Sequence, residues 1–422
     1  MRLTIRALMT VILCLPAGNA GAQFLKYTPP GGPEETPESR KEEIDRDVEE
    51  ARYRLGPLRV APWASLGDIA YVRNLFATGP QPPNDLTATA GLGFRAYLRN
   101  GRKATWTAQV LPEYVWWREQ GERRQLNGRY LLGFYGFFNR LTLEVRAGRE
   151  QQQQILTPEV PVPVSSRVDG GELLTEVELT HSLFAFAAAS LNQEHNLVED
   201  LGDPRAEGLV LLDREERVTR AGLRLRRGRE WSVALGAERS QVDFDRGTLD
   251  RSNSGTSPVA EVRFQGRYLG FQAGAAARSL EARRGAAFVP YDKVTGNAAF
   301  SVGSGRRLGG TLYGSRDLVY SVSSSYAYLD DERLGVAFTL GLGRRSQSRF
   351  FYENGSNTFT AFEPGAPRRR DDVSSYGASL TFGLRRNLSF GLQALRSNFD
   401  AKLPGSDRTF TTVGTTLSLG GR

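Results

Sequence analysis

The sequence predicts an all-β protein, a single transmembrane antiparallel β-barrel of about 16 to 18 strands with a short helical leader. Three observations predict this class. From Gly56 onward, segments of about ten residues alternate apolar with polar or small side chains, the period of a strand with two different faces. The connections between the segments alternate between short and long. No run of about 18 apolar residues follows the N-terminal segment, which excludes a helical membrane protein.

Residues 1–22 have the pattern of a secretory signal peptide. Arg2 and Arg6 accompany an apolar stretch too short to span a bilayer, and Ala20-Gly21-Ala22 forms a processing site. We therefore expect the mature chain to begin at Gln23. The only cysteine, Cys14, lies in this segment, so the mature chain has no disulfide and no thiolate metal site.

Residues 23–55 differ in composition from the rest and form the second predicted unit, before a barrel at 56–422. A Pro-rich and Gly-rich linker at 29–33 precedes Thr36-Pro37-Glu38, which has the residues of a helix N-terminus. The predicted helix ends near Tyr53 and has few apolar positions. We expect a solvated periplasmic segment. The alternative is a helix that enters or covers the periplasmic mouth of the barrel.

Alternation is clearest at 141–147, where Leu141, Leu143 and Val145 are apolar and Glu144 and Arg146 are charged. A soluble sandwich also alternates, so this pattern alone does not identify a membrane barrel. The strands predicted from it are 57–71, 85–98, 103–117, 124–138, 141–150, 170–181, 183–194, 214–227, 230–243, 257–268, 270–283, 290–302, 306–317, 319–329, 332–345, 371–385, 388–399 and 408–419.

The connections favour the membrane barrel over a soluble β-sandwich or a solenoid. Outer-membrane barrels have short periplasmic turns, longer external loops and an even number of strands, which returns both ends to the periplasm. Aromatic residues also lie near predicted strand ends, as in an interfacial girdle. The short turns are predicted at 139–140, 182, 228–229, 269, 305, 330–331 and 386–387, and long links at 151–169, 195–213, 244–256 and 346–370.

The entry segment 55–63, Leu-Gly-Pro-Leu-Arg-Val-Ala-Pro-Trp, continues through Leu66, Asp68 and Tyr71 to Asn74-Leu75-Phe76. These residues resemble the opening of the outer-membrane β-barrel porins linked to bacterial exopolysaccharide systems, the β-barrel porin type 2-like family. The resemblance covers about twenty residues. It implies a barrel in the outer membrane of a Gram-negative-type bacterium, associated with glycan-secretion machinery, and it supplies no catalytic residues.

The sequence lacks the residue patterns of an enzyme. Only two histidines are present, His181 at a predicted turn and His195 at the start of an acidic loop. No serine or carboxylate pattern accompanies them as a hydrolase would require, and no Gly-rich phosphate loop opens a helix. We therefore expect no enzymatic activity, no cofactor and no metal. The net charge of +8 comes mainly from arginines spread along the chain, which argues against nucleic-acid binding.

Two functions remain open. The first is a porin-like conduit for exopolysaccharide or anionic solutes, in which the charged faces line the lumen and select by size and charge. The second is a non-conducting structural or anchoring barrel in which the same side chains fill the lumen with salt bridges. Both place the chain in contact with outer-membrane lipid. The residues predicted to line the lumen are Glu144, Arg146, Glu176, Glu178, Arg220, Arg224, Arg226, Glu261, Arg263, Arg267 and Arg278.

Overall fold

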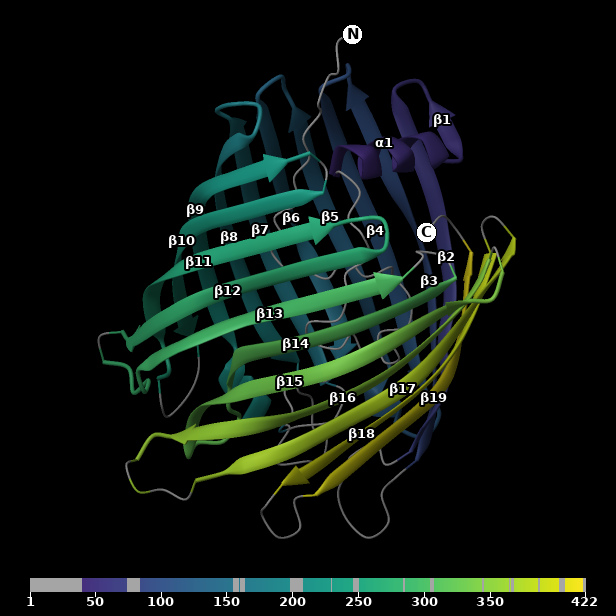
Figure 1. Ribbon diagram of the computed structural model, residues 1–422. Helices are drawn as coiled ribbons and strands as arrows, with labels where there is room; N and C mark the ends of the chain where they lie inside the picture. Colours follow the sequence, from purple (N-terminus) through teal and green to yellow (C-terminus); the bar gives the residue numbers. More distant parts are fainter. Residues whose placement is uncertain are drawn as a thin grey trace.

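The described residues form one closed antiparallel β-barrel of 18 long strands, β2 to β19, together with one α-helix and one short strand, β1 (Figure 1). This computed structural model describes residues 40–73, 84–154, 159, 164–197, 208–228, 230–245, 250–283, 285–303, 307–343, 345–363, 365, 368–385, 388–401 and 407–419. The predicted signal peptide and the linker at 29–33 lie outside these residues.

The elements have the following bounds. Helix α1 is Arg40–Glu50, and two short 3₁₀ helices are η1, Gly121–Arg123, and η2, Gly208–Leu212. The strands are β1 Tyr53–Leu55, β2 Leu58–Arg73, β3 Asp85–Asn100, β4 Ala104–Trp117, β5 Gln125–Phe137, β6 Leu141–Gln154, β7 Val164–Glu178, β8 Leu183–Leu197, β9 Arg214–Arg227, β10 Trp231–Phe244, β11 Asn253–Gln265, β12 Leu269–Ala282, β13 Tyr291–Gly303, β14 Leu308–Tyr320, β15 Tyr326–Gly341, β16 Ser346–Ala361, β17 Arg370–Arg385, β18 Leu388–Ala401 and β19 Arg408–Leu419.

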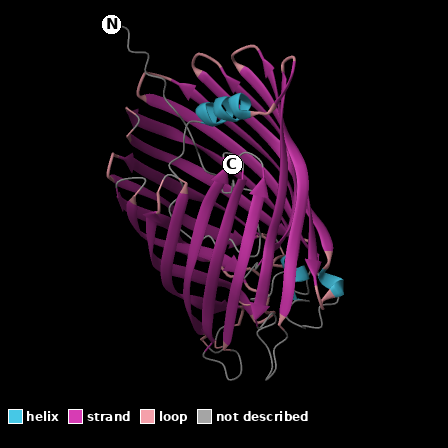
Figure 2. Ribbon diagram, turned by 90° about the vertical axis from the view of Figure 1, so that its right-hand side faces the viewer, coloured by secondary structure: helices cyan, strands magenta, loops and turns pink. Residues whose placement is uncertain are grey.

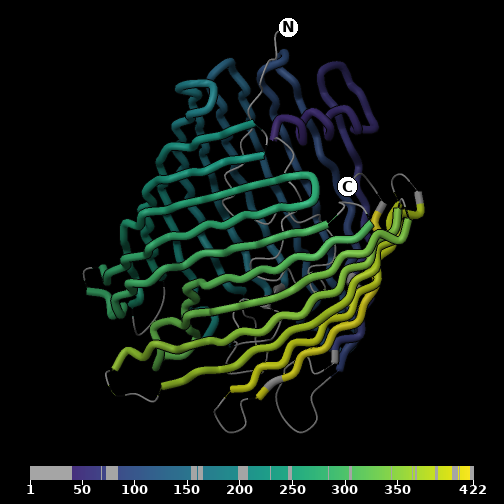
Figure 3. The backbone as a smooth tube through the Cα atoms, viewed as in Figure 1, coloured from purple at the N-terminus to yellow at the C-terminus, as the bar shows by residue number. Residues whose placement is uncertain are grey.

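Each strand pairs with the next in the chain, and the tilted strands follow one another around the wall (Figure 3). The barrel closes where β19 pairs with β2, with Val413 opposite Tyr71. The first barrel strand therefore begins, and the last one ends, at the end that carries the short turns. Gly101 and Gly228 adopt positive φ angles of 67° and 66° in two of these turns, a conformation that glycine adopts without steric cost. No described helix is both long and apolar enough to span a membrane.

The predicted fold class is confirmed, but two predicted connections are wrong. Asp330 and Asp331 do not form a turn, because β15 runs through both. Residues 346–361 do not form a loop, because they are β16. Polar residues misled the prediction at both places. Asp330 accepts a bond from Lys293 Nζ at 2.5 Å, and buried Asn357 accepts one from Arg333 at 3.3 Å. The two errors cancel, so the predicted count of eighteen and its parity hold.

The outer face of the barrel is apolar and the inner face is largely polar. On β6, Val145 is 41% exposed whereas its neighbour Glu144 is 4% exposed. This is the reverse of a soluble protein, in which large apolar side chains gather inside. Large exposed apolar side chains occur all around the wall, including Leu92, Leu132, Leu173, Leu223, Leu235, Val294, Leu312, Leu334, Phe350, Leu392 and Val413.

A charge on the outer face is expected to impair the barrel more than a charge on the inner face. Leu312→Arg and Leu223→Arg each place a guanidinium in hydrocarbon, which costs about 2–4 kcal/mol near the bilayer midplane. Thr311→Arg, the adjacent inner position on β14, is the matched control and should be mild. Urea unfolding of the protein refolded in lipid vesicles measures the difference. Equal losses at Leu312 and Thr311 would mean that the two faces are assigned wrongly.

Candidate functional site

Helix α1 lies at the barrel mouth that carries the short turns (Figure 2). Ile44 and Val48 are four residues apart and so share one face of the helix. They are 5% and 4% exposed and pack with Ala51 against Tyr97 of β3 and Tyr135 of β5. The expectation of a solvated leader helix is therefore wrong, and the alternative, a helix at the mouth, is the observed arrangement. The few apolar positions of α1 are sufficient to dock the helix because the inward-facing Tyr97 and Tyr135 pack against them.

Polar contacts also hold α1 to the inner wall. Tyr97 donates a hydrogen bond to Asp47 at 3.1 Å, and Arg99 pairs with Asp45. At the start of the helix, Arg40 Nε lies 3.5 Å from Glu144 of β6. Burial raises the pKa of Asp47, while the bond from Tyr97 opposes this shift. These contacts reach β3 and β6, so α1 is fixed at two separated points of the rim.

A chain of ion pairs covers the inner wall formed by β7 to β12. Glu176 of β7 receives bonds from Arg226 at 2.7 Å and Arg224 at 3.3 Å. Arg224 continues to Glu261 of β11 at 3.2 Å. Both Arg224 and Arg226 are less than a tenth exposed. A guanidinium buried to this degree needs a carboxylate partner, and the three contacts of Arg224 and Arg226 with glutamates of β7 and β11 supply it.

The series of ion pairs continues through Arg220 of β9. This side chain binds Glu261 at 2.8 Å and Glu238 of β10 at 2.6 Å, and Arg278 of β12 lies 3.7 Å from Glu238. Four arginines and three glutamates are thus linked in one series, which leaves a formal excess of one positive charge. The inner wall is nearly balanced, although its sequence looks basic. The linked residues in order are Arg226, Glu176, Arg224, Glu261, Arg220, Glu238 and Arg278.

Other predicted lumen residues lie apart from this series. Arg146 binds Glu172 at 2.5 Å, and Glu144 contacts Arg40 of α1. Glu178 and Arg263 are half-buried at the inner positions of β7 and β11. Arg267 is a correction. The predicted strand 257–268 ends at Gln265, so Arg267 is exposed in the following turn, 5.0 Å above the ring of Tyr268.

The set of residues predicted to line the lumen also omitted several residues that bind its members. Glu238 and Glu172 lie at inward-facing positions of β10 and β7, and counting every second residue along each strand could have included them. Arg40 has no such signal, because its partner Glu144 is about a hundred residues away in the sequence.

The wall formed by β2 to β4 and β16 to β19 has a different chemistry. The inner positions of β17 to β19 hold mainly apolar and hydroxyl side chains, and Ser375 and Ser397 share a hydrogen bond at 3.0 Å. Strands β3, β4 and β16 also carry charged inner side chains, among them Arg95, Glu113 and Glu353. The lumen is therefore asymmetric, with the connected series of ion pairs on β7 to β12 and mainly neutral inner groups on β17 to β19. The apolar cluster on this side contains Ala70, Val72, Val115, Trp117, Leu395 and Phe410, with Phe351 packed against it.

At the mouth that carries the long connections, Glu159 spans the barrel. It belongs to the connection between β6 and β7, yet it accepts bonds from Ser321 Oγ at 3.0 Å and Val322 N at 2.8 Å, between β14 and β15. Those strands are eight places away in a ring of eighteen, almost opposite. Arg369 lies 3.7 Å from the carboxylate, and Arg251 donates to the carbonyl oxygens of Ser321 and Ser323. We call this set the Glu159 tether.

The Glu159 carboxylate is buried, and polar and positively charged groups surround it. Glu159 is 5% exposed, and burial raises the pKa of its carboxyl. The bonds from Val322 and Ser321 and the charges of Arg369 and Arg251 oppose that shift. A packed apolar cluster beside it includes Leu209 and Leu212 of η2, so the β8–β9 connection also folds against this side. Each mouth of the barrel therefore contains described groups that are not part of the wall, α1 at one and Glu159 at the other.

No group of three or more His, Cys, Asp or Glu side chains that could hold a metal ion is found among the residues described. His181 is exposed in the β7–β8 turn, and His195 is half-buried on β8. They lie at opposite ends of the strand.

Undocking of α1 is expected when its apolar face is made acidic. In Ile44→Asp/Val48→Asp the two buried contacts with Tyr97 and Tyr135 are lost, and the helix is too short to persist alone. Hydrogen exchange of the 40–50 amides should then approach the rate of an unfolded peptide. The control Glu42→Ala/Glu49→Ala changes exposed positions and should keep the protection. Persisting protection in the double Asp variant would contradict the docking described above.

Loss of the Glu159 carboxylate is expected to leave the backbone amide of Val322 without its hydrogen-bond acceptor. In Glu159→Ala the backbone amide of Val322 loses its acceptor, so its hydrogen exchange should accelerate by about tenfold or more. Glu122→Ala, at an exposed position of another long connection, is the control. Unchanged exchange at Val322 would show that another acceptor, or burial alone, protects this amide.

The comparisons with known proteins concern the fold. A scan of protein-family models and a search of curated proteins both return no match. Solved structures that match include Pseudomonas aeruginosa OccK2 (OpdF) in complex with glucuronate, with 14% identity, 87% of this chain and 99% of that chain covered, and a TM-score of 0.52. The P. aeruginosa outer membrane protein OpdK matches with 13% identity, 86% and 98% coverage, and a TM-score of 0.51. Acinetobacter baumannii OccAB3 matches with 9% identity, 87% and 99% coverage, and a TM-score of 0.50. The chain therefore has the porin-type barrel fold, which fits the outer membrane of Gram-negative bacteria.

Proposed function

We propose that the protein is an outer-membrane channel for small anionic or neutral solutes. The observation that carries this proposal is the construction of the lumen, in which the ion-paired wall of β7 to β12 faces the mainly apolar and hydroxyl inner positions of β17 to β19. A barrel of 18 strands is wider than side chains from the wall alone can fill. The Glu159 tether and α1 narrow the two mouths, as expected for a pathway that selects by size.

The net charge of the inner wall supports the solute class. The series of four arginines and three glutamates leaves one formal positive charge, which favours anions weakly over cations. The complex of OccK2 with glucuronate is a property of that protein, and it suggests a sugar acid as the first solute to try. The two narrowed mouths favour small solutes over a polymer. Service to an exopolysaccharide system and to glycan-secretion machinery rests on the resemblance of residues 55–76 alone.

A non-conducting anchoring barrel is the second candidate, because segments lie at both mouths and ion pairs occupy one wall. It differs from the channel in one measurable property, the passage of ions.

Single-channel recording of the mature chain in planar bilayers separates the two candidates. We expect discrete conductance steps in the parent protein, with larger steps in Glu159→Ala and in Ile44→Asp/Val48→Asp because each variant releases one narrowing segment. Glu122→Ala should leave the steps unchanged. If neither the parent nor either releasing variant conducts, the channel is rejected in favour of the anchor.

Charge selection can be tested at Glu176. Glu176→Gln keeps the size of the side chain but leaves Arg224 and Arg226 without their shared carboxylate. The anion-over-cation permeability ratio, measured from the reversal potential in a salt gradient, should rise about twofold or more. Glu281→Gln, exposed at the end of β12, removes the same charge outside the series and serves as the control. An unchanged or lower ratio in Glu176→Gln would remove this wall from the selective pathway.

A further inference from the structure

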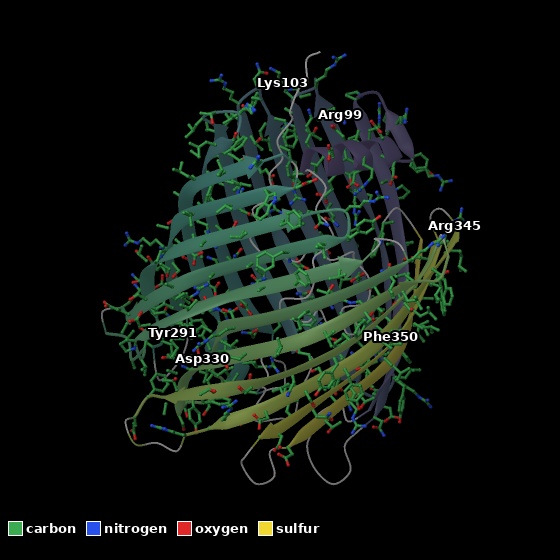
Figure 4. The ribbon with its side chains drawn as sticks, in the orientation of Figure 1. Arg99, Lys103, Tyr291, Asp330, Arg345 and Phe350 are labelled. Atoms are coloured by element: carbon green, nitrogen blue, oxygen red, sulfur yellow. The ribbon has the colours of Figure 1, made fainter. Side chains whose placement is uncertain are left out.

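The rim that carries the short turns is strongly basic. In the described turns that join consecutive barrel strands at this rim, and at the strand ends beside them, the exposed charged side chains are seven bases and one acid, Glu230. Helix α1 and the residues after it, at the same mouth, add three exposed acids and three exposed bases and so leave this excess unchanged. The bases come from six of the eight short connections, so they are spread around the rim. Figure 4 shows two of them, Lys103 and Arg345, at well-separated points of this rim. The seven are Arg102, Lys103, Arg140, Arg227, Arg267, Arg307 and Arg345.

The opposite rim has the reverse balance. In the described part of the long connections and at the strand ends beside them, the exposed bases are Arg118, Arg124, Arg368 and Arg370. The exposed acids there include Glu119, Glu122, Asp245, Asp250, Glu363 and Asp407. The excess of bases is therefore a property of one end, and the overall basic composition of the chain does not explain it.

The rim bases carry no ion pair within the described structure, in contrast to the arginines of the inner wall. Lys103 donates to the side-chain oxygen of Asn139, and Arg267 stacks on Tyr268, which are contacts with neutral groups. Arg99, just inside the rim, is paired with Asp45 of α1 and is not counted among them. The seven bases therefore remain available to an anionic partner outside the barrel.

Aromatic side chains mark the level at which these bases lie. Trp106 and Trp231 are 44% and 47% exposed near the first residues of β4 and β10, and Phe138 and Tyr268 are exposed in turns. Aromatic side chains in such positions sit at the headgroup level of a bilayer. The basic side chains directly beyond them then reach the phosphate groups. A guanidinium binds phosphate through parallel N–H donors, which makes arginine well suited to this contact.

We propose that this basic rim binds the phosphate headgroups of anionic phospholipids in the leaflet that surrounds the short turns. The inference goes beyond the proposed channel and rests on it only for the placement of the barrel in a membrane. Because the bases encircle the barrel, the partner it fits is a ring of lipids. A single anionic protein would contact one sector of the rim.

Brominated lipids test the proposal, since bromine quenches nearby tryptophan. The protein, in a Trp116→Phe background, is reconstituted in vesicles of phosphatidylcholine and phosphatidylglycerol at about three to one, with bromine on one lipid or the other. Trp106 and Trp231, both beside the basic rim, are then the exposed reporters, because Trp63 and Trp117 are buried. Quenching by brominated phosphatidylglycerol should exceed its share of the lipid by about threefold, since basic residues near a bilayer attract anionic lipid.

The variants identify the bases responsible. The variant Arg140→Gln, Arg227→Gln, Arg267→Gln, Arg307→Gln and Arg345→Gln should lower the preference to about one, whereas lysine at the same five positions should retain most of it. Arg118→Gln/Arg368→Gln, at the other rim, should change nothing. The proposal is overturned if the parent protein shows no preference, or if the five-site Gln variant keeps it. Single-channel conductance is recorded on the same samples, so a failure of the lipid proposal is distinguishable from a failure of the channel.

Discussion

The closed ladder of backbone hydrogen bonds is the constraint on which the rest of the structure depends. In hydrocarbon an unpaired N–H or C=O costs several kcal/mol, so a sheet that crosses a membrane has to join its own edges. The pairing of β19 with β2 meets this requirement. Closure also turns alternate side chains inward, which concentrates polar groups in a lumen that lipid cannot reach. The apolar belt, the ion-paired wall and the two mouths all follow from that separation of faces.

The inner wall shows how the protein accommodates charge in a confined space. Arg224 and Arg226 lose much of their hydration, and Glu176 compensates both. Such pairing reduces the attraction that a row of free arginines would exert on anions, leaving a weak preference. At the outer surface of the short-turn rim the arrangement is the opposite, because the bases there have no acidic partner among the described residues. Arginine thus forms buried ion pairs on the inner wall, whereas at the rim its charge is exposed.

The Glu159 tether and α1 add contacts at the two mouths that the wall alone does not supply. Each joins segments that are distant in sequence through a few buried contacts, such as Glu159 with Val322 and Ile44 with Tyr97. Because few contacts hold each one, either can be released without opening the wall. This separates the stability of the barrel, which lies in its ladder, from the width of its passage.

The sequence by itself determined the class and the inward parity of residues such as Glu176 and Arg220, because alternation with a period of two is a local property. It misassigned 330–331 and 346–361, where polar residues in a long strand look like a loop until partners such as Lys293 and Arg333 are known. Only the tertiary structure decided which charges are paired, that α1 docks at the mouth, and that Glu159 contacts the far wall. The bond between Glu159 and Val322 joins residues 163 positions apart, a separation over which no local pattern operates.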